Sequence, residues 1–147
     1  AIEGLPEFLA TISQEYTKRV LPDFLPEGTK VSFRVWAVSQ WAGDFNPIHI
    51  HDSNLSGVCF LKIPPKFDEE YAKEDHHPTA GCLEFIGSVP NHFARHSFLA
   101  KPEVGDFYIF PSWLTHQVYP FRSEGERRSM AFNVHFTAEN PVKGLNV

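Results

Sequence analysis

The stretch GDFNPIHIHDSNLSGVCFLKI (residues 43–63) places a pair of histidines directly before a nearly continuous apolar run. The run from Leu55 to Ile63 is closed by two prolines, which predicts a central, buried strand. On an extended chain, residues i and i+2 face the same side, so His49 and His51 project together. The two imidazoles are therefore either a pair of metal ligands or two polar residues on a solvated edge.

The segments outside this stretch predict one helix followed by several strands. Apolar residues at helical spacing predict a helix over Leu5–Val20, and from Val31 the period changes to two. Lys66–Ala80 is predicted to be a long exposed loop and Pro90–Lys101 an irregular segment. Further short strands are expected at Cys82–Ile86, Asp106–Phe110, His116–Phe121 and Arg127–Phe136.

Short strands at this spacing behind one helix predict a mainly β sandwich or barrel. A chain of 147 residues suits one domain with a sizeable core. We expect a single domain over 1–147, with an N-terminal helical segment (1–30), a catalytic β core (31–136) and a tail (137–147).

Composition argues against several classes of partner. The net charge of −5 and the lack of a basic run argue against nucleic acid. No stretch has the roughly 18 apolar residues of a membrane helix, and the first residues lack the pattern of a signal peptide. We expect a cytoplasmic protein that acts on a small molecule or peptide, with no nucleic-acid or membrane partner; the oligomeric state stays open.

A distant histidine gives the His-x-His pair a possible third partner. His116 follows a predicted strand and turn, at the start of the next strand. Two strands that are adjacent in a sheet would bring His49, His51 and His116 onto one side of a metal ion. Three ligands on one side leave positions open for substrate, as in catalytic rather than structural metal sites.

The spacing around these histidines resembles the two cupin motifs. Gly43 precedes His49 by five intervening residues, and Gly105 precedes Pro111 by five, with His116 beyond it. The resemblance implies a double-stranded β-helix, that is, a jelly-roll, cupin-like fold with an N-terminal α-helix. The glutamate of the first motif is missing, since Leu55 and Ser56 stand at its allowed positions, and Trp113 replaces a glycine of the second motif.

Arg127 lies eleven residues beyond His116, on the same strand face as Ser129, Ala131 and Asn133. A face that carries an arginine, a hydroxyl and small residues is unusual for a plain core. It suits a bound carboxylate, because a guanidinium matches a carboxylate in a two-point fork and serine adds a donor.

This ordered set is similar to the Fe(II)- and 2-oxoglutarate-dependent oxygenases. The segments HIHDSNLSGVCFLKIPP, GCLEF and PEVGDFYIFPSWLTHQVYPFRSEGERRSMAFN resemble a branch of small bacterial and phage oxygenases related to prolyl hydroxylases. The resemblance runs from about Val31 to Phe136. It implies a dioxygenase that uses Fe(II), 2-oxoglutarate and O₂ to hydroxylate a prolyl or other peptidyl residue or a small metabolite, with release of succinate and CO₂.

The resemblance also implies roles for residues, and one of them departs from the family pattern. The family has a carboxylate where this chain has His51, so the metal ligands are predicted to be His49, His51 and His116, with Asp52 in reserve if a bulge turns it inward. Three neutral imidazoles would leave Fe(II) more positive than the usual set. The cosubstrate is predicted to contact Arg127, Ser129, Asn133 and Tyr108.

Two alternatives stay open. A cupin-type oxygenase or isomerase that does not use 2-oxoglutarate would keep the three histidines and make Arg127 structural. A metal-free jelly-roll binding module would use the histidines only to line a pocket. Trp36 and Trp113 are candidates for lining the substrate pocket in any of these readings, although ordinary core positions would also suit them.

Overall fold

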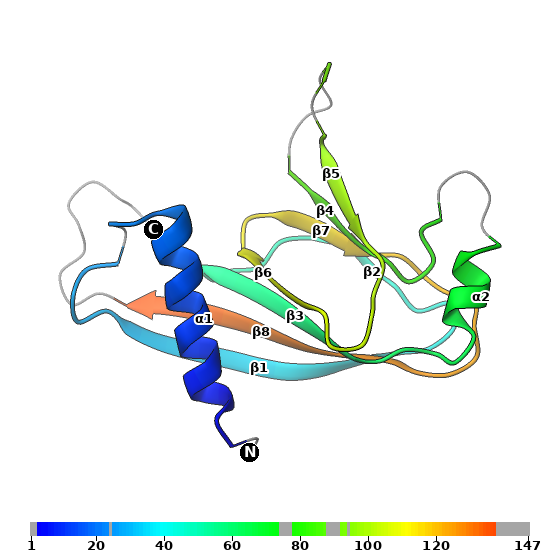
Figure 1. Cartoon of the computed structure of the whole chain (residues 1–147), viewed down its shortest axis with the longest axis horizontal. Coiled ribbons are helices and arrows are strands. Elements are labelled where there is room, and N and C mark those ends of the chain that lie inside the picture. Colours follow the sequence, from blue (N-terminus) through cyan, green and yellow to red (C-terminus); the bar gives the residue numbers. More distant parts are fainter. Residues whose placement is uncertain (1–2, 24, 74–77, 88–91, 94, 138–147) are drawn as a thin grey trace.

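The computed structural model describes residues 3–23, 25–73, 78–87, 92–93 and 95–137. Two antiparallel four-stranded sheets face each other, and an N-terminal helix lies against one of them (Figure 1). The elements are α1 (Leu5–Val20), β1 (Lys30–Gln40), β2 (Asn46–His49), β3 (Leu55–Lys62), α2 (Phe67–Tyr71), β4 (Leu83–Ile86), β5 (Ser97–Ala100), β6 (Phe107–Pro111), β7 (Thr115–Val118) and β8 (Arg127–Thr137).

The strand order identifies a double-stranded β-helix. One sheet has the order β1-β8-β3-β6 and the other has β2-β7-β4-β5. Apart from the β4–β5 hairpin, consecutive strands lie in opposite sheets, so the chain winds back and forth as in a jelly roll. The predicted fold class is confirmed, and β3 is the central strand expected from its apolar run, since β8 and β6 pair with its two sides.

The alternation of side chains along β8 divides the core into two parts. Phe132 and Val134 point to the outer face of their sheet, where they pack with Leu9 of α1. The other face meets the second sheet, and Phe60 and Phe85 pack there with Phe110. Arg127, Ser129 and Ala131, which alternate with the residues of the outer face, therefore face the space between the sheets.

Two predictions made from local sequence were wrong. Part of the segment expected to be an exposed loop forms α2, because the Phe67 ring is buried against Phe121 and the Glu70 carboxylate accepts hydrogen bonds from the chain at Ser123. Part of the segment expected to be irregular forms β5, which pairs with β4. Tertiary contacts create both elements, and neither has a periodic sequence pattern.

Among the described residues, no helix is long and apolar enough to cross a membrane. Of the predicted tail (137–147), Thr137 is the last residue of β8, and positions 138–147 lie outside the described residues.

Gly57 allows β3 to lie close to the core. A Cβ atom at this position would sit 2.1 Å from the Phe132 ring and 2.7 Å from the Tyr108 carbonyl oxygen. Both neighbours belong to strands paired with β3, so they cannot move aside easily. We expect Gly57→Ala to lower the free energy of unfolding by about 2–3 kcal/mol in urea denaturation, because overpacking strains the core.

Gly87 supplies the control, since the nearest atom to its added Cβ is 4.0 Å away. Gly87→Ala is expected to change stability by less than about 0.5 kcal/mol. Equal effects of the two substitutions would contradict the close packing at Gly57.

Candidate active site

Two strands that are far apart in sequence bring the first and third histidines together. β2 pairs with β7, and His49 stands opposite His116. The register also pairs Asn46 with Val118. Three residue steps along β2 (Asn46 to His49) therefore match two steps along β7 (Val118 to His116). This is a β-bulge, which places Asn46 and His49 on the same side despite their odd spacing.

His51 lies beyond the end of β2, where backbone and side-chain bonds hold its loop. The His51 N–H donates to the Ser112 carbonyl (3.0 Å), and the Ser112 N–H donates to the Asn54 carbonyl (3.2 Å). The buried Ser112 hydroxyl also bonds the hydroxyls of Ser53 (2.5 Å) and Ser56 (2.8 Å). Ser112 therefore links the loop that carries His51 to both β3 and the end of β6.

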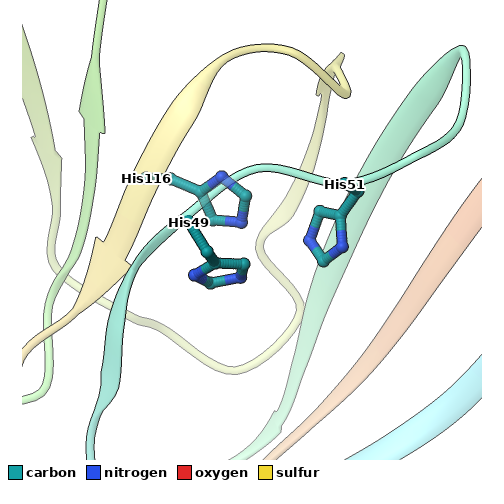
Figure 2. A group of neighbouring side chains, drawn as sticks. All are labelled: His49, His51 and His116. Atoms are coloured by element: carbon teal, nitrogen blue, oxygen red, sulfur yellow. The ribbon is translucent and has the colours of Figure 1, made fainter.

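The three imidazoles point toward a common space (Figure 2). One ring nitrogen from each of His49, His51 and His116 lies within 4.8 Å of the others. The ring centroids of His49 and His116 are 4.2 Å apart, and each lies 5.0 Å from that of His51. Nitrogens at about 2.1 Å from one ion would lie roughly 3–4 Å apart, so small movements suffice for shared coordination.

Backbone carbonyls fix the protonation of two of these rings. His49 Nδ1 lies 2.6 Å from the Pro47 carbonyl oxygen, and His116 Nδ1 lies 2.9 Å from that of Leu114. A carbonyl oxygen can only accept, so Nδ1 is the donor in both rings and Nε2 is the nitrogen available to a metal. Metal-binding histidines are oriented in this way, and the donor set fits a divalent cation.

Burial keeps the rings of His116 and His51 in the neutral form that binds a metal. It lowers the pKa of His116 from its ordinary 6.5 to about 4, although the hydrogen bond to Leu114 favours the charged ring. Burial, followed by the charge of His49, also lowers the pKa of His51. Both rings are therefore neutral near pH 7, the form that binds metal. The reserve ligand Asp52 is exposed and is not part of the cluster.

A cavity of roughly 190 Å³ opens beside the histidines, between the two sheets. It is lined by Trp36, Val38, Gln40, Asn46, His49, His51, Gly57, Val58, Leu83, Phe110, His116, Val118, Arg127, Ser129 and Ala131. Its volume is below the 300–1,000 Å³ that is typical for pockets of drug-sized ligands. The cavity therefore suits a small molecule, and a larger partner would have to lie at its mouth.

Arg127 brings a buried positive charge into this cavity. The residue is 2% exposed, and its guanidinium lies 4.8 Å above the Phe60 ring. One terminal nitrogen donates to the Gln40 side-chain oxygen at 2.5 Å, whereas Nε has no hydrogen-bond partner. Burial lowers the pKa of Arg127 to about 10, which still leaves the guanidinium charged at neutral pH.

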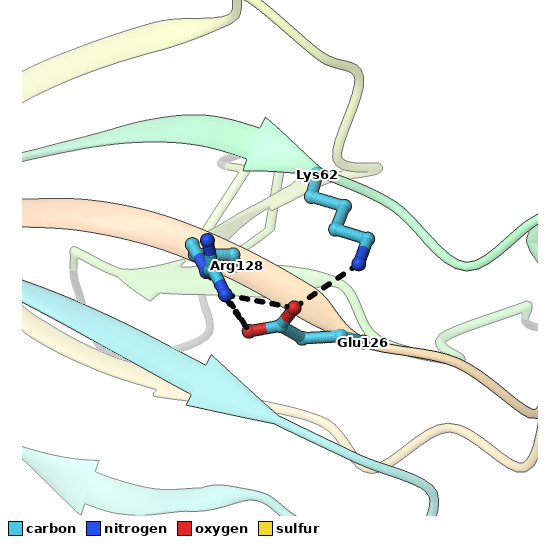
Figure 3. A network of polar contacts seen from close by, with 3 residues as sticks. All are labelled: Lys62, Glu126 and Arg128. Carbon is cyan, nitrogen blue, oxygen red and sulfur yellow. Dashed lines mark hydrogen bonds and ion pairs between the residues drawn. The ribbon is translucent and has the colours of Figure 1, made fainter.

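The acidic neighbour of Arg127 in sequence does not neutralise this charge. Glu126 is bound by Arg128 and Lys62 on the other side of β8 (Figure 3). Hydrogen bonding by Ser39, together with these two cations, lowers the pKa of Glu126 to about 2. Among the described residues, no carboxylate pairs with Arg127. Since an unpaired buried charge is costly, the cavity fits a bound anion.

The predicted cosubstrate and pocket residues divide into two groups. Ser129 and Trp36 line the cavity, and the Trp36 ring lies 6.3 Å from that of His51. Asn133, Tyr108 and Trp113 are not among the lining residues. Asn133 accepts a hydrogen bond from Ser56 at 2.9 Å, the Tyr108 hydroxyl points toward Asp106 at 3.5 Å, and Trp113 is 67% exposed. Their proposed contacts stay predictions.

Two polar lining residues, Gln40 and Asn46, were missed by sequence reasoning. Gln40, which orients Arg127, is 87 positions away from it and meets it only because β1 pairs with β8. Asn46 turns inward because of the bulge in β2. The sequence offers one weak signal for the second, since Pro47 stands within the bulge and proline in strands favours such positions.

The fold and the site together define a jelly-roll protein with a candidate three-histidine metal centre beside a buried arginine. Residues 34–133 match the family described as "Putative 2OG-Fe(II) oxygenase". The match covers more than half of the chain, and the chain belongs to this family. Among curated proteins, none matches the sequence significantly.

Solved structures support the fold. A prolyl-4-hydroxylase from Pseudomonas putida is 19% identical, with a TM-score of 0.58, and the alignment covers 92% of this chain and 68% of that one. A 2OG-Fe(II) oxygenase family oxidoreductase from Burkholderia pseudomallei is 14% identical, with a TM-score of 0.54 and coverages of 88% and 57%. HygX from Streptomyces hygroscopicus, solved with nickel and 2-oxoglutarate, is 10% identical, with a TM-score of 0.51 and coverages of 88% and 67%.

The depressed pKa of His116 predicts acid sensitivity of the metal-free protein. In the unfolded chain this ring protonates below about 6.5, whereas in the folded protein it protonates near 4. The unfolded state therefore binds more protons between these values, and stability falls as the pH drops through this window. Urea unfolding of chelator-treated protein should show lower stability at pH 5 than at pH 7, and His116→Gln should reduce this difference.

His135→Gln is the matched control, because His135 is exposed on β8. This variant should keep the pH dependence of the wild type. The assignment fails if His116→Gln also keeps it.

Metal binding should show whether His51 or Asp52 is the third ligand. At about one hundred times its Kd, Mn(II) is expected to raise the free energy of unfolding by about 2.7 kcal/mol, since it binds the native state. His51→Ala should remove most of this gain at the same Mn(II) concentration, and Asp52→Asn should retain it. The reverse result in denaturation curves would make Asp52 the ligand.

Proposed function

We propose that the protein is a dioxygenase that hydroxylates its substrate with Fe(II), 2-oxoglutarate and O₂. Membership of the oxygenase family supports this proposal, and so does the cluster of three histidines. The observation that carries it is the buried Arg127 guanidinium, which has a free Nε and no carboxylate partner among the described residues. A dicarboxylic acid with one end at the metal would supply the missing negative charge.

The chain's own residues would hold and orient the reactants. His49, His51 and His116 would bind Fe(II) through ring nitrogens, and Arg127 with Ser129 would hold the far carboxylate of 2-oxoglutarate. When bound, Fe(II) with 2-oxoglutarate and O₂ supplies the oxidation, in which a C–H bond becomes C–OH while 2-oxoglutarate becomes succinate and CO₂.

Two features of the cavity would serve this chemistry. The hydrogen bond from Arg127 to Gln40 fixes the direction of the guanidinium, so that a carboxylate meets a preset fork. Apolar walls at Val58, Phe110 and Val118 limit the access of water. Exclusion of water strengthens the attraction between Arg127 and its anion.

A prolyl or other peptidyl residue and a small metabolite are the two candidate classes of substrate. The cavity of roughly 190 Å³ has room for the cosubstrate but little beyond it. The oxidised group would therefore enter from the mouth, past Trp36. A peptide could lie across this mouth with one side chain inserted, whereas a metabolite would be held by rim residues alone.

A cupin-type enzyme that does not use 2-oxoglutarate would need the same histidines but no anion at Arg127. Substitution of Arg127 distinguishes the two functions. In Arg127→Met, 2-oxoglutarate affinity should fall at least about a hundred-fold, because two charge-assisted hydrogen bonds are lost. Stability without ligand should change by no more than about 1 kcal/mol, since the substitution also removes an unpaired buried charge.

The measurement is an anaerobic titration of Fe(II)-loaded protein with 2-oxoglutarate, followed by its weak visible absorption band, together with succinate release in air. Arg128→Met is the matched control, because Arg128 is the neighbouring residue but pairs with Glu126 on the opposite side of the strand. Normal 2-oxoglutarate binding and succinate release by Arg127→Met would refute the role of Arg127 and favour the cupin-type function.

A further inference from the structure

We propose that the substrate carries a carboxylate and that Arg34, stacked on Trp36 at the mouth of the cavity, binds it. This inference rests on the proposed function and goes further, because it names the chemical class of the substrate and a residue that selects it. Three features of the molecule support it: the position of Arg34, its lack of a partner, and the charge of the metal centre.

Arg34 and Arg127 lie at opposite ends of one sheet face. In the pairing of β1 with β8, Gln40 stands opposite Arg127, and Trp36 stands opposite Ala131. Arg34 is two residues beyond Trp36 and therefore shares its face. At about 3.3 Å per residue, Arg34 lies roughly 20 Å along the strand from Gln40, and Trp36, whose ring is near His51, lies between them. Arg127 is buried in the cavity, whereas Arg34 is exposed and lies outside the lining, next to Trp36.

The contacts of Trp36 connect Arg34 to the metal centre. The Arg34 guanidinium lies 5.9 Å from the centroid of the Trp36 ring. The same ring lines the cavity and lies 6.3 Å from the His51 ring. A guanidinium that rests on an aromatic ring is restrained, but its N–H groups stay free to bind a carboxylate in a two-point fork. A substrate held there would lie beside the three histidines.

Within the described part of the chain, no acidic side chain occupies this fork. Among the described residues, no carboxylate pairs with Arg34, although the chain has 18 acidic residues. Asp52 follows His51 directly and is exposed, but it forms no ion pair with Arg34. The described lining of the cavity contains neither aspartate nor glutamate. Arg127 is therefore the one Lys, Arg, Asp or Glu among the described lining residues, in a protein whose net charge is −5.

The ligand set adds to this positive charge. Three histidines contribute no negative charge, so Fe(II) would keep both of its charges, and Arg127 adds one more. The two carboxylates of 2-oxoglutarate balance two of these three charges. One positive charge then remains at the centre, and Arg34 adds another at the mouth. An anionic substrate would reduce the excess of positive charge, whereas a neutral substrate would leave it unchanged.

Paired acids and amides test the proposal directly. The panel consists of N-acetylamino acids and tripeptides, each as the free acid and as the C-terminal amide. Calorimetric titration of protein loaded with Mn(II) and 2-oxoglutarate measures binding without turnover. We expect at least one acid to bind about ten-fold more tightly than its amide. Preference among N-acetylamino acids would indicate a small metabolite, and preference among tripeptides alone would indicate a peptide terminus.

Substitutions then assign the preference to Arg34. Arg34→Gln should reduce affinity for the preferred acid about ten-fold, to the level of the amide, and leave amide and 2-oxoglutarate affinities unchanged. Arg34→Lys should restore part of the preference, because it keeps the charge but loses the fork. Arg19→Gln, which removes an exposed arginine on α1, is the matched control and should behave as the wild type.

The results that would refute the role of Arg34 differ from those that would refute the proposed dioxygenase function. Equal binding of acids and amides, no acid binding at millimolar concentration, or an unchanged preference in Arg34→Gln would overturn the role of Arg34. Failure of the wild type to bind 2-oxoglutarate would instead count against the proposed function. In that case the acid preference is measured on protein loaded with Mn(II) alone, where the same three results decide it.

Discussion

The unpaired charge of Arg127 is the physical constraint around which the cavity is organised. A buried cation must be balanced by a partner or by a ligand, and in this protein the acidic neighbour in sequence, Glu126, is bound by Lys62 and Arg128 on the other face of β8. The Gln40 side-chain oxygen accepts a hydrogen bond from one terminal nitrogen of Arg127, and the Phe60 ring lies against the Arg127 guanidinium. Neither residue brings a negative charge. Among the described residues, Arg127 is therefore a buried cation without a carboxylate partner, an arrangement that fits a bound anion.

The histidine cluster depends on a different kind of constraint, which is backbone geometry. A bulge in β2 aligns His49 with His116, and the bonds of Ser112 hold the loop of His51 against β3 and β6. Carbonyl oxygens hold Nδ1 of His49 and of His116, so Nε2 of each ring is the nitrogen available to a metal. These features are independent of the charge on Arg127. They converge on one space because both sheets contribute strands to its walls.

The periodicity of the sequence predicted the main elements well, and it failed where structure depends on distant partners. The helix α1 has a helical period that indicates its buried face, and the central strand β3 has a nearly continuous apolar run. The segments that form α2 and β5 have none, since α2 is anchored by Phe67 and Glu70 to residues beyond β7, and β5 forms by pairing with β4. Local propensity carries no information about either partner.

The sequence by itself determined which chemical groups are available and on which strand faces they lie. The His-x-His pair, the distant His116 and the alternation of Arg127 with Ser129 follow from residue type and a period of two. Only the tertiary structure decided which of them meet: Gln40 reaches Arg127, Asn133 turns to Ser56, and His49 stands opposite His116. The physical reason is that strand pairing and bulges join residues tens of positions apart, and no local pattern encodes that register.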